Sequence, residues 1–289
     1  MTAMETTTRK TTTATTTTLL KHEWLRTRGQ LATLLGLIAL IGVVGSLLGA
    51  SGWPLLSELG LLAGVLAAAI AVPAVQLTLT ADYWRSGYGR TGYFTHAIPV
   101  RGSRIFWAKL AWAMLASLVA IVLTLALVLL AWWAIAQRSA GPAVSWSTLT
   151  EAWSTVTAMA PAWIIAAGVV LLLASVLVWP VYYYFSVSVG HERRLAGLGA
   201  GGPVVVFVTV YLATQLLALL GMIVLPFGVG ETGSETLGLV RFDMISELTA
   251  GAAPSNDVMP IGFVASLVAL AGFCLWRTAR SWNRNVALG

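Results

Sequence analysis

The sequence predicts an all-α membrane protein with six transmembrane helices. Three observations predict this fold class: 58% of the 289 residues are hydrophobic, only 10% are charged, and the apolar residues gather in long stretches. A soluble domain carries roughly 25% charged residues, and a transmembrane helix needs roughly 20 mainly apolar residues. The expected spans are residues 30–50, 56–80, 106–136, 162–188, 203–227 and 260–277.

The N-terminal region is expected to lie outside the membrane. Residues 1–18 are rich in threonine and contain no apolar run, which predicts a disordered cytoplasmic tail before a transmembrane domain over residues 19–289. Within that domain Leu20, Trp24 and Leu31 share one helical face. This spacing predicts an interfacial helix over Leu19–Arg28 that leads into the first span.

Positive charge fixes the expected orientation. With six spans, every one of the 17 lysines and arginines except Arg138 and Arg241 falls in segments that share one side of the membrane. Lysine and arginine are enriched in cytoplasmic loops. We therefore expect a multi-pass protein of the cell membrane with both termini in the cytoplasm. The same bias accounts for the basic composition, so no nucleic-acid partner is expected.

Residues at the ends of the spans refine the expected elements. Tryptophans mark the two membrane interfaces: Trp24, Trp84 and Trp282 on the cytoplasmic side, and Trp53, Trp132, Trp133 and Trp163 on the other. Apolar residues repeat at helical spacing in the third loop (Trp146, Leu149, Trp153, Val156) and in the fifth loop (Leu237, Val240, Met244, Leu248). These repeats predict short amphipathic helices in the external loops.

The sequence lacks the patterns of most enzymes. His191 and Glu192 begin like the zinc motif HExxH, but Leu195 stands where the second histidine belongs. Neither Gly-rich stretch, 87–92 or 197–202, continues into the Lys-Ser/Thr of a phosphate-binding loop. We therefore expect no catalytic residues, no metal and no cofactor in this chain. The spans also lack a carboxylate near the membrane midplane, which disfavours an ion-coupled carrier.

The longest cytoplasmic connection, residues 82–109, carries the most information about function. Residues Gly92–Ala97 can form a short helix that Pro99 would end. Aromatic residues on a short helix framed by arginines suit a docking element for another protein. The same pattern also suits an interfacial anchor in which Tyr93 and Phe94 enter the lipid. Spacing alone leaves both interpretations open.

This connection resembles the segment between the second and third spans of type-2 ABC exporter permeases. In that family a Gly-rich stretch leads into a short helix, an Ile/Leu-Pro-Val turn with arginines, and a span that opens with a lysine. The matching residues are Ile98, Pro99, Val100, Arg101, Arg104 and Lys109. Six spans and a long fifth loop extend the resemblance over nearly the whole chain. Thr95-His96-Ala97 departs from the family, where many relatives carry leucines, so the helix register is left open.

The resemblance implies a membrane-spanning subunit of an ATP-driven exporter of an amphiphilic or apolar substrate. A coupling helix would sit in a groove of a separate ABC ATPase subunit, which binds the ATP. The implied contact residues are Arg90, Tyr93, Phe94, His96 and Arg101, with a secondary contact through Trp24, Arg193 and Arg194. A second permease subunit, identical or similar, and membrane lipids complete the expected partners.

Two further expectations accompany this interpretation. The family's fifth loop carries short external helices that partly re-enter the membrane, which here would be Gly228–Met259. The alternative from another class is a non-transporting membrane accessory, sensor or immunity protein that uses the same cytoplasmic loop to bind something else.

Overall fold

The computed structural model describes residues 16–89, 92, 97, 100–138, 146–192, 195–232, 236–249 and 258–284. Within these ranges six helices are long and apolar enough to cross a membrane. They are α1 (Thr16–Ala50), α2 (Pro54–Gly87), α4 (Gly102–Arg138), α6 (Ala162–Gly190), α7 (Gly201–Val224) and α9 (Phe263–Arg284). The predicted six-span, multi-pass membrane architecture is confirmed.

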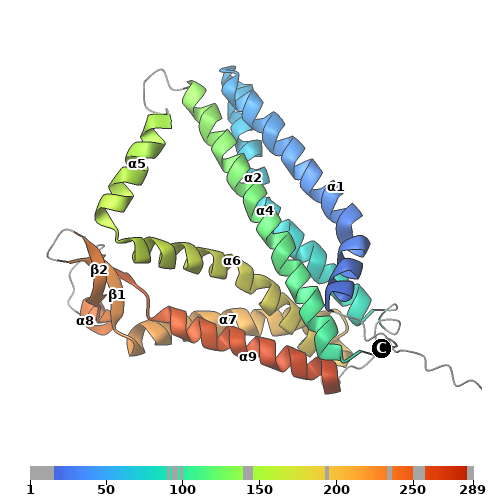
Figure 1. Cartoon of the computed structure of the whole chain (residues 1–289). Helices are drawn as coiled ribbons and strands as arrows, with labels where there is room; N and C mark the ends of the chain where they lie inside the picture. The colour runs from blue at the N-terminus through green and yellow to red at the C-terminus, as the bar shows by residue number, and fades with distance from the viewer. Residues whose placement is uncertain are drawn as a thin grey trace, which may run out of the picture.

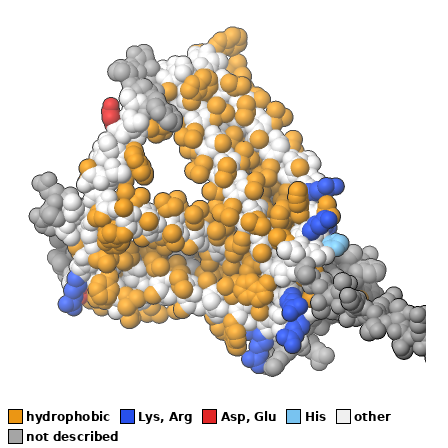
Figure 2. Space-filling view, viewed as in Figure 1, with side chains coloured by type: hydrophobic (Ala, Val, Ile, Leu, Met, Phe, Trp, Pro, Cys, Tyr) orange, Lys and Arg blue, Asp and Glu red, His pale blue; other side chains and the backbone are white. Residues whose placement is uncertain are grey.

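The helices pack as two groups. Helices α1, α2 and α4 contact one another and form the N-terminal group, whereas α6, α7 and α9 form the C-terminal group. Figure 1 shows that the groups lie together where α1 begins and α9 ends, and diverge toward the opposite end. Lysine and arginine side chains gather where the groups join, so we call this the charged end and the other the far end (Figure 2).

Helix α5 (Trp146–Met159) lies at the far end, between α4 and α6 in the chain. It covers the third-loop residues whose spacing predicted a helix. The space-filling view shows that side chains leave an opening among α4, α5 and α6 (Figure 2). The N-terminal and C-terminal groups are thus held close at the charged end and spread apart at the far end.

The prediction of external helices in the fifth loop is wrong at Leu237 and Val240. Three described strands form an antiparallel sheet in the order β2-β1-β3: β1 (Phe227–Glu231), β2 (Leu237–Arg241) and β3 (Val258–Pro260). The described helix of this loop, α8, covers only Met244–Thr249. Glycines within β1 and β2 disfavour helix, and cross-strand pairing satisfies the backbone instead.

The connection that the sequence predicts over residues 82–109 is shorter in the structure, because α2 continues to Gly87 and α4 begins at Gly102. We call the remaining residues, 88–101, the coupling segment, after the coupling helix that the resemblance implies there. Helix α1 is likewise continuous from Thr16 to Ala50, so the residues predicted as an interfacial helix and the first span form one helix. Its Trp24 stacks on Trp112 of α4, with ring centroids 6.3 Å apart.

Candidate functional site at the charged end

Two of the predicted contact residues lie within the described part of the chain. Arg101 is exposed and directly precedes α4, and Trp24 is half exposed beside α4. The other six predicted contacts, Arg90, Tyr93, Phe94, His96, Arg193 and Arg194, lie outside the described residues. The structure does describe the residues that contact both ends of the coupling segment, and these residues form the candidate site.

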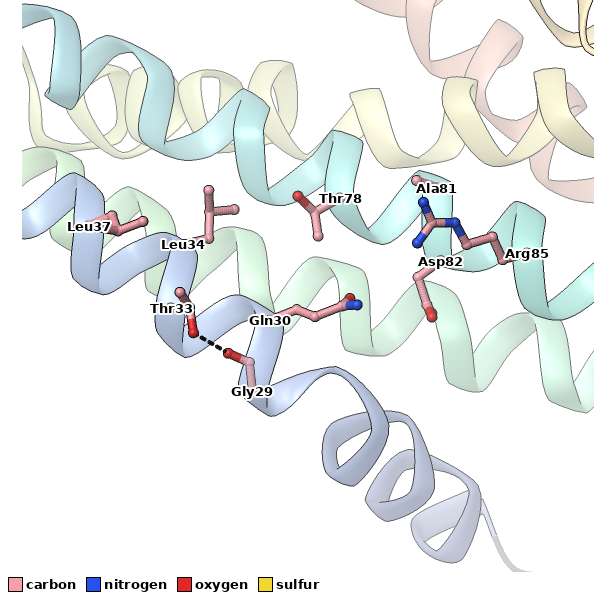
Figure 3. Close-up of a pocket in the computed structure, with 9 residues that line it drawn as sticks. All are labelled: Gly29, Gln30, Thr33, Leu34, Leu37, Thr78, Ala81, Asp82 and Arg85. Carbon is pink, nitrogen blue, oxygen red and sulfur yellow. Dashed lines mark hydrogen bonds between the residues drawn. The ribbon is translucent and has the colours of Figure 1, made fainter.

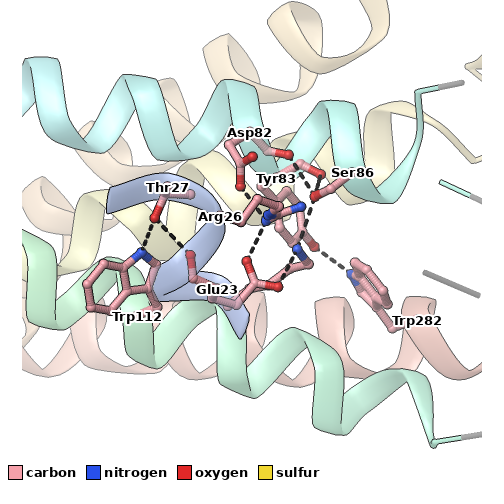
Figure 4. A network of polar contacts seen from close by, with 9 residues as sticks. Glu23, Arg26, Thr27, Asp82, Tyr83, Ser86, Trp112 and Trp282 are labelled. Atoms are coloured by element: carbon pink, nitrogen blue, oxygen red, sulfur yellow. Dashed lines mark hydrogen bonds and ion pairs between the residues drawn. The ribbon is translucent and has the colours of Figure 1, made fainter. Parts of the chain in front are cut away.

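A network of charges joins the three helices of the N-terminal group (Figure 4). Lys109 of α4 is only 3% exposed, and its ammonium donates to Glu23 Oε1 at 2.8 Å and to Ser86 Oγ at 3.0 Å. Arg26 pairs with the same Glu23 and with Asp82 of α2, the latter at 2.5 Å. A buried charge is tolerated when it is paired and hydrogen-bonded. The network therefore fixes α1 against the ends of α2 and α4 that lead into the coupling segment.

A second cluster, built around Tyr83, joins the two groups. The Tyr83 hydroxyl shares a hydrogen bond of 2.6 Å with Ser188 of α6 and accepts one of 2.5 Å from Trp282 Nε1 of α9. The Tyr83 ring stacks on Tyr184 with centroids 3.9 Å apart. Trp282, predicted from the sequence to mark the membrane interface, is 3% exposed and packs between the groups. Its indole N–H finds its partner inside the protein rather than at the lipid headgroups.

The start of the coupling segment is held by a second set of rings. Trp84 Nε1 donates to His191 Nε2 at 2.8 Å, and Tyr88 stacks on the same imidazole with centroids 5.0 Å apart. Because Nε2 accepts, Nδ1 carries the proton and donates to Val187 O at 2.8 Å. Burial raises the pKa of the Tyr88 phenol to about 12, so this side chain stays neutral.

The end of the coupling segment is held by α9. The backbone N–H of Ser103, in the first turn of α4, donates to Asn283 Oδ1 at 3.1 Å. This bond caps one of the free N–H groups at the helix start. Gly102 lies directly against the backbone of Trp282, where a side chain would clash. Both ends of the coupling segment therefore contact the C-terminal group.

The acidic residue of the incomplete zinc motif has a structural partner. Glu192 pairs with Arg277 of α9 at 2.6 Å and accepts from Ser281 at 2.9 Å. Within the described ranges no group of three His, Cys, Asp or Glu side chains could hold a metal ion. Glu192 thus ties the end of α6 to α9 through Arg277 and Ser281.

Comparisons of the chain with protein families, with curated proteins and with solved structures find no match.

Proposed function

We propose that this chain is the membrane-spanning subunit of an ATP-driven ABC exporter, with the charged end in the cytoplasm. A separate ATPase subunit would bind the coupling segment, and a second permease subunit would complete the transporter. The observation that carries the proposal is that the predicted coupling segment begins and ends at the joint between the two helix groups. At its start Tyr88 packs against Trp282, with ring centroids 5.9 Å apart, and just past its end Ser103 is hydrogen-bonded to Asn283.

This geometry suggests how an external movement would enter the membrane. A displacement of the coupling segment would move α2 and α4, because each of them is one unbroken helix that adjoins the segment. The charge network around Lys109 would carry α1 along, because Glu23 and Arg26 tie it to both helices. The Tyr83 cluster would let the C-terminal group rotate against the N-terminal group, changing access from the far end.

The proposed cargo is amphiphilic or apolar. The opening among α4, α5 and α6 is bordered largely by hydrophobic side chains (Figure 2). A substrate path of this composition favours molecules that partition into lipid over ions, which would need compensating charges.

Co-purification with a measurement of ATP hydrolysis tests the proposal. The full chain, tagged and extracted from its native membrane, is expected to bring down an ATPase whose activity depends on the chain. Phe94→Ala and Arg90→Glu should lower both recovery of the ATPase and hydrolysis. Trp53→Ala is the matched aromatic control, because Trp53 is exposed at the far end.

The result separates the two function classes. Recovery of other proteins without an ATPase would support the alternative of a non-transporting accessory protein. Unchanged assembly and transport in the Phe94→Ala and Arg90→Glu variants would contradict the assignment of the coupling segment.

A further inference from the structure

A groove of about 640 Å³ runs between α1 and α2, beginning at the charged end. Its lining changes along its length, as Figure 3 shows: Asp82 and Arg85 lie at one end, and Leu34 and Leu37 lie at the other. Gly29, Gln30, Thr33, Thr78 and Ala81 complete the lining. The volume falls within the roughly 300–1,000 Å³ of small-molecule sites. A lining that is charged at one end and apolar at the other fits an amphiphile.

We propose that this groove binds an anionic phospholipid from the leaflet at the charged end. Arg85 would hold the phosphate, and an acyl chain would lie along Leu34 and Leu37. This is a defined lipid site, distinct from the general contact of the helices with the bilayer, and it does not depend on the proposed transport function.

The charges at the groove favour an anionic ligand. Asp82 is the acidic residue of the lining, and its charge is balanced within the network of two cations, Arg26 and Lys109, and two carboxylates, Asp82 and Glu23. The guanidinium of Arg85 carries five N–H donors in a planar fork that matches phosphate oxygens. An arginine near the membrane surface attracts anionic headgroups.

The position of the groove favours a lipid over a soluble anion. Leu37 is 54% exposed on α1, within the predicted first span, so its surroundings are hydrocarbon. A soluble phosphate compound would reach Arg85 but would leave the leucine wall uncovered. A phospholipid covers both, because its headgroup lies at the level of the charged end and its chains lie at the level of the spans.

The test measures lipids retained by the purified full chain after delipidation in detergent. Phosphatidylglycerol or phosphatidylcholine is added back, and bound lipid is counted by native mass spectrometry. The wild type is expected to retain phosphatidylglycerol over phosphatidylcholine. Arg85→Gln should reduce that preference about fivefold, as expected for one arginine near an anionic headgroup. Ala81→Trp, which fills the groove and keeps every charge, should reduce retention of both lipids.

Matched controls separate the groove from general effects. Arg280→Gln removes one positive charge from α9 in the other helix group, and Val65→Trp places the same indole ring at an exposed position of α2 away from the groove. Both should retain lipid like the wild type. If Arg85→Gln lowers the melting temperature, the Ala81→Trp variant decides the outcome.

Three results would overturn the proposal. The first is equal retention of the two lipids by the wild type. The second is an unchanged lipid preference in Arg85→Gln together with full lipid retention in Ala81→Trp. The third is displacement of the bound lipid by an equal concentration of the soluble headgroup glycerophosphoglycerol. The last result would show that the leucine side chains of the groove contribute nothing to lipid binding.

Discussion

Lys109 shows at the scale of one residue how the charged end is held together. Its ammonium is buried near the start of α4, and Glu23 of α1 supplies the compensating charge at 2.8 Å. Removing one partner of such a pair leaves an uncompensated buried charge, which costs more than the pair itself contributes. The network therefore holds α1 in place mainly through the free-energy cost of leaving one of its buried charges unpaired.

The first prediction concerns this pair. Glu23→Gln should lower the free energy of unfolding in detergent by roughly 3 kcal/mol. The double variant Glu23→Gln with Lys109→Met removes both charges and should recover much of that loss. Glu58→Gln is the control, because Glu58 is 67% exposed and its pair with Arg138 contributes about 1 kcal/mol or less. Equal losses in Glu23→Gln and Glu58→Gln would refute the assigned role of burial.

The second prediction concerns the hydroxyl of Tyr83. Tyr83→Phe keeps the stacked ring but leaves Trp282 Nε1 and Ser188 Oγ without this partner. Removing one partner of a buried hydrogen bond costs about 1–3 kcal/mol, so the free energy of unfolding should fall by that amount. Tyr183→Phe, whose ring packs on Trp179 and Phe207, is the control and should be nearly neutral. Identical stability of the two variants would contradict the bridging role of Tyr83.

At the scale of elements, close packing of α1 and α2 depends on glycine. A Cβ added at Gly45 would lie 2.7 Å from the backbone oxygen of Gly60, closer than the two helices permit. Small residues let transmembrane helices approach in this way, which brings their backbones into contact. Gly36 of the same helix faces open space, so it provides an internal comparison.

The third prediction uses this pair of glycines. Gly45→Ala should destabilise the protein by about 1–3 kcal/mol through overpacking. Gly36→Ala should be neutral or stabilise it by up to about 1 kcal/mol, because alanine is the better helix former. Thermal unfolding of the two variants in detergent measures the difference. Equal changes would show that the helices do not pack through Gly45.

The elements differ in how far the sequence predicts them. Long apolar stretches predicted all six spans, because a membrane requires such stretches wherever a helix crosses it. The sheet of the fifth loop was missed, because Leu237 and Val240 have helical spacing yet lie on a strand paired with Phe227–Glu231. Strand pairing depends on distant residues, such as Gly228 opposite Pro260, and local periodicity does not contain that information.

At the scale of the whole molecule, the joint between the helix groups could not be predicted. Tyr83 and Trp282 lie 199 positions apart in the sequence, and an isolated tryptophan near a span end is typical of a membrane interface. The charged residues of the same end were easier to place, since the positive-inside bias acts on each loop separately. The sequence predicts where a partner-binding segment lies, and the structure shows which residues hold the two ends of residues 88–101.

The fourth prediction tests the orientation of the molecule. The cysteine of the natural sequence, Cys274, is fully buried and should not react with a membrane-impermeant maleimide. In intact cells the variant Leu55→Cys, at the far end, should be labelled at once. Arg104→Cys, at the charged end, should be labelled only after the membrane is permeabilised. The reverse pattern would place the charged end outside the cell.

The charged end is proposed to transmit movement from a bound ATPase to the two helix groups. The most direct test is the distance between spin labels at Leu55 of α2 and Val224 of α7, in a Cys274→Ala background of the reconstituted complex. Both positions are exposed at the far end, one in each group. We predict that the distance distribution shifts when ATP and vanadate trap the ATPase. An unchanged distribution in a complex that hydrolyses ATP would contradict the claim.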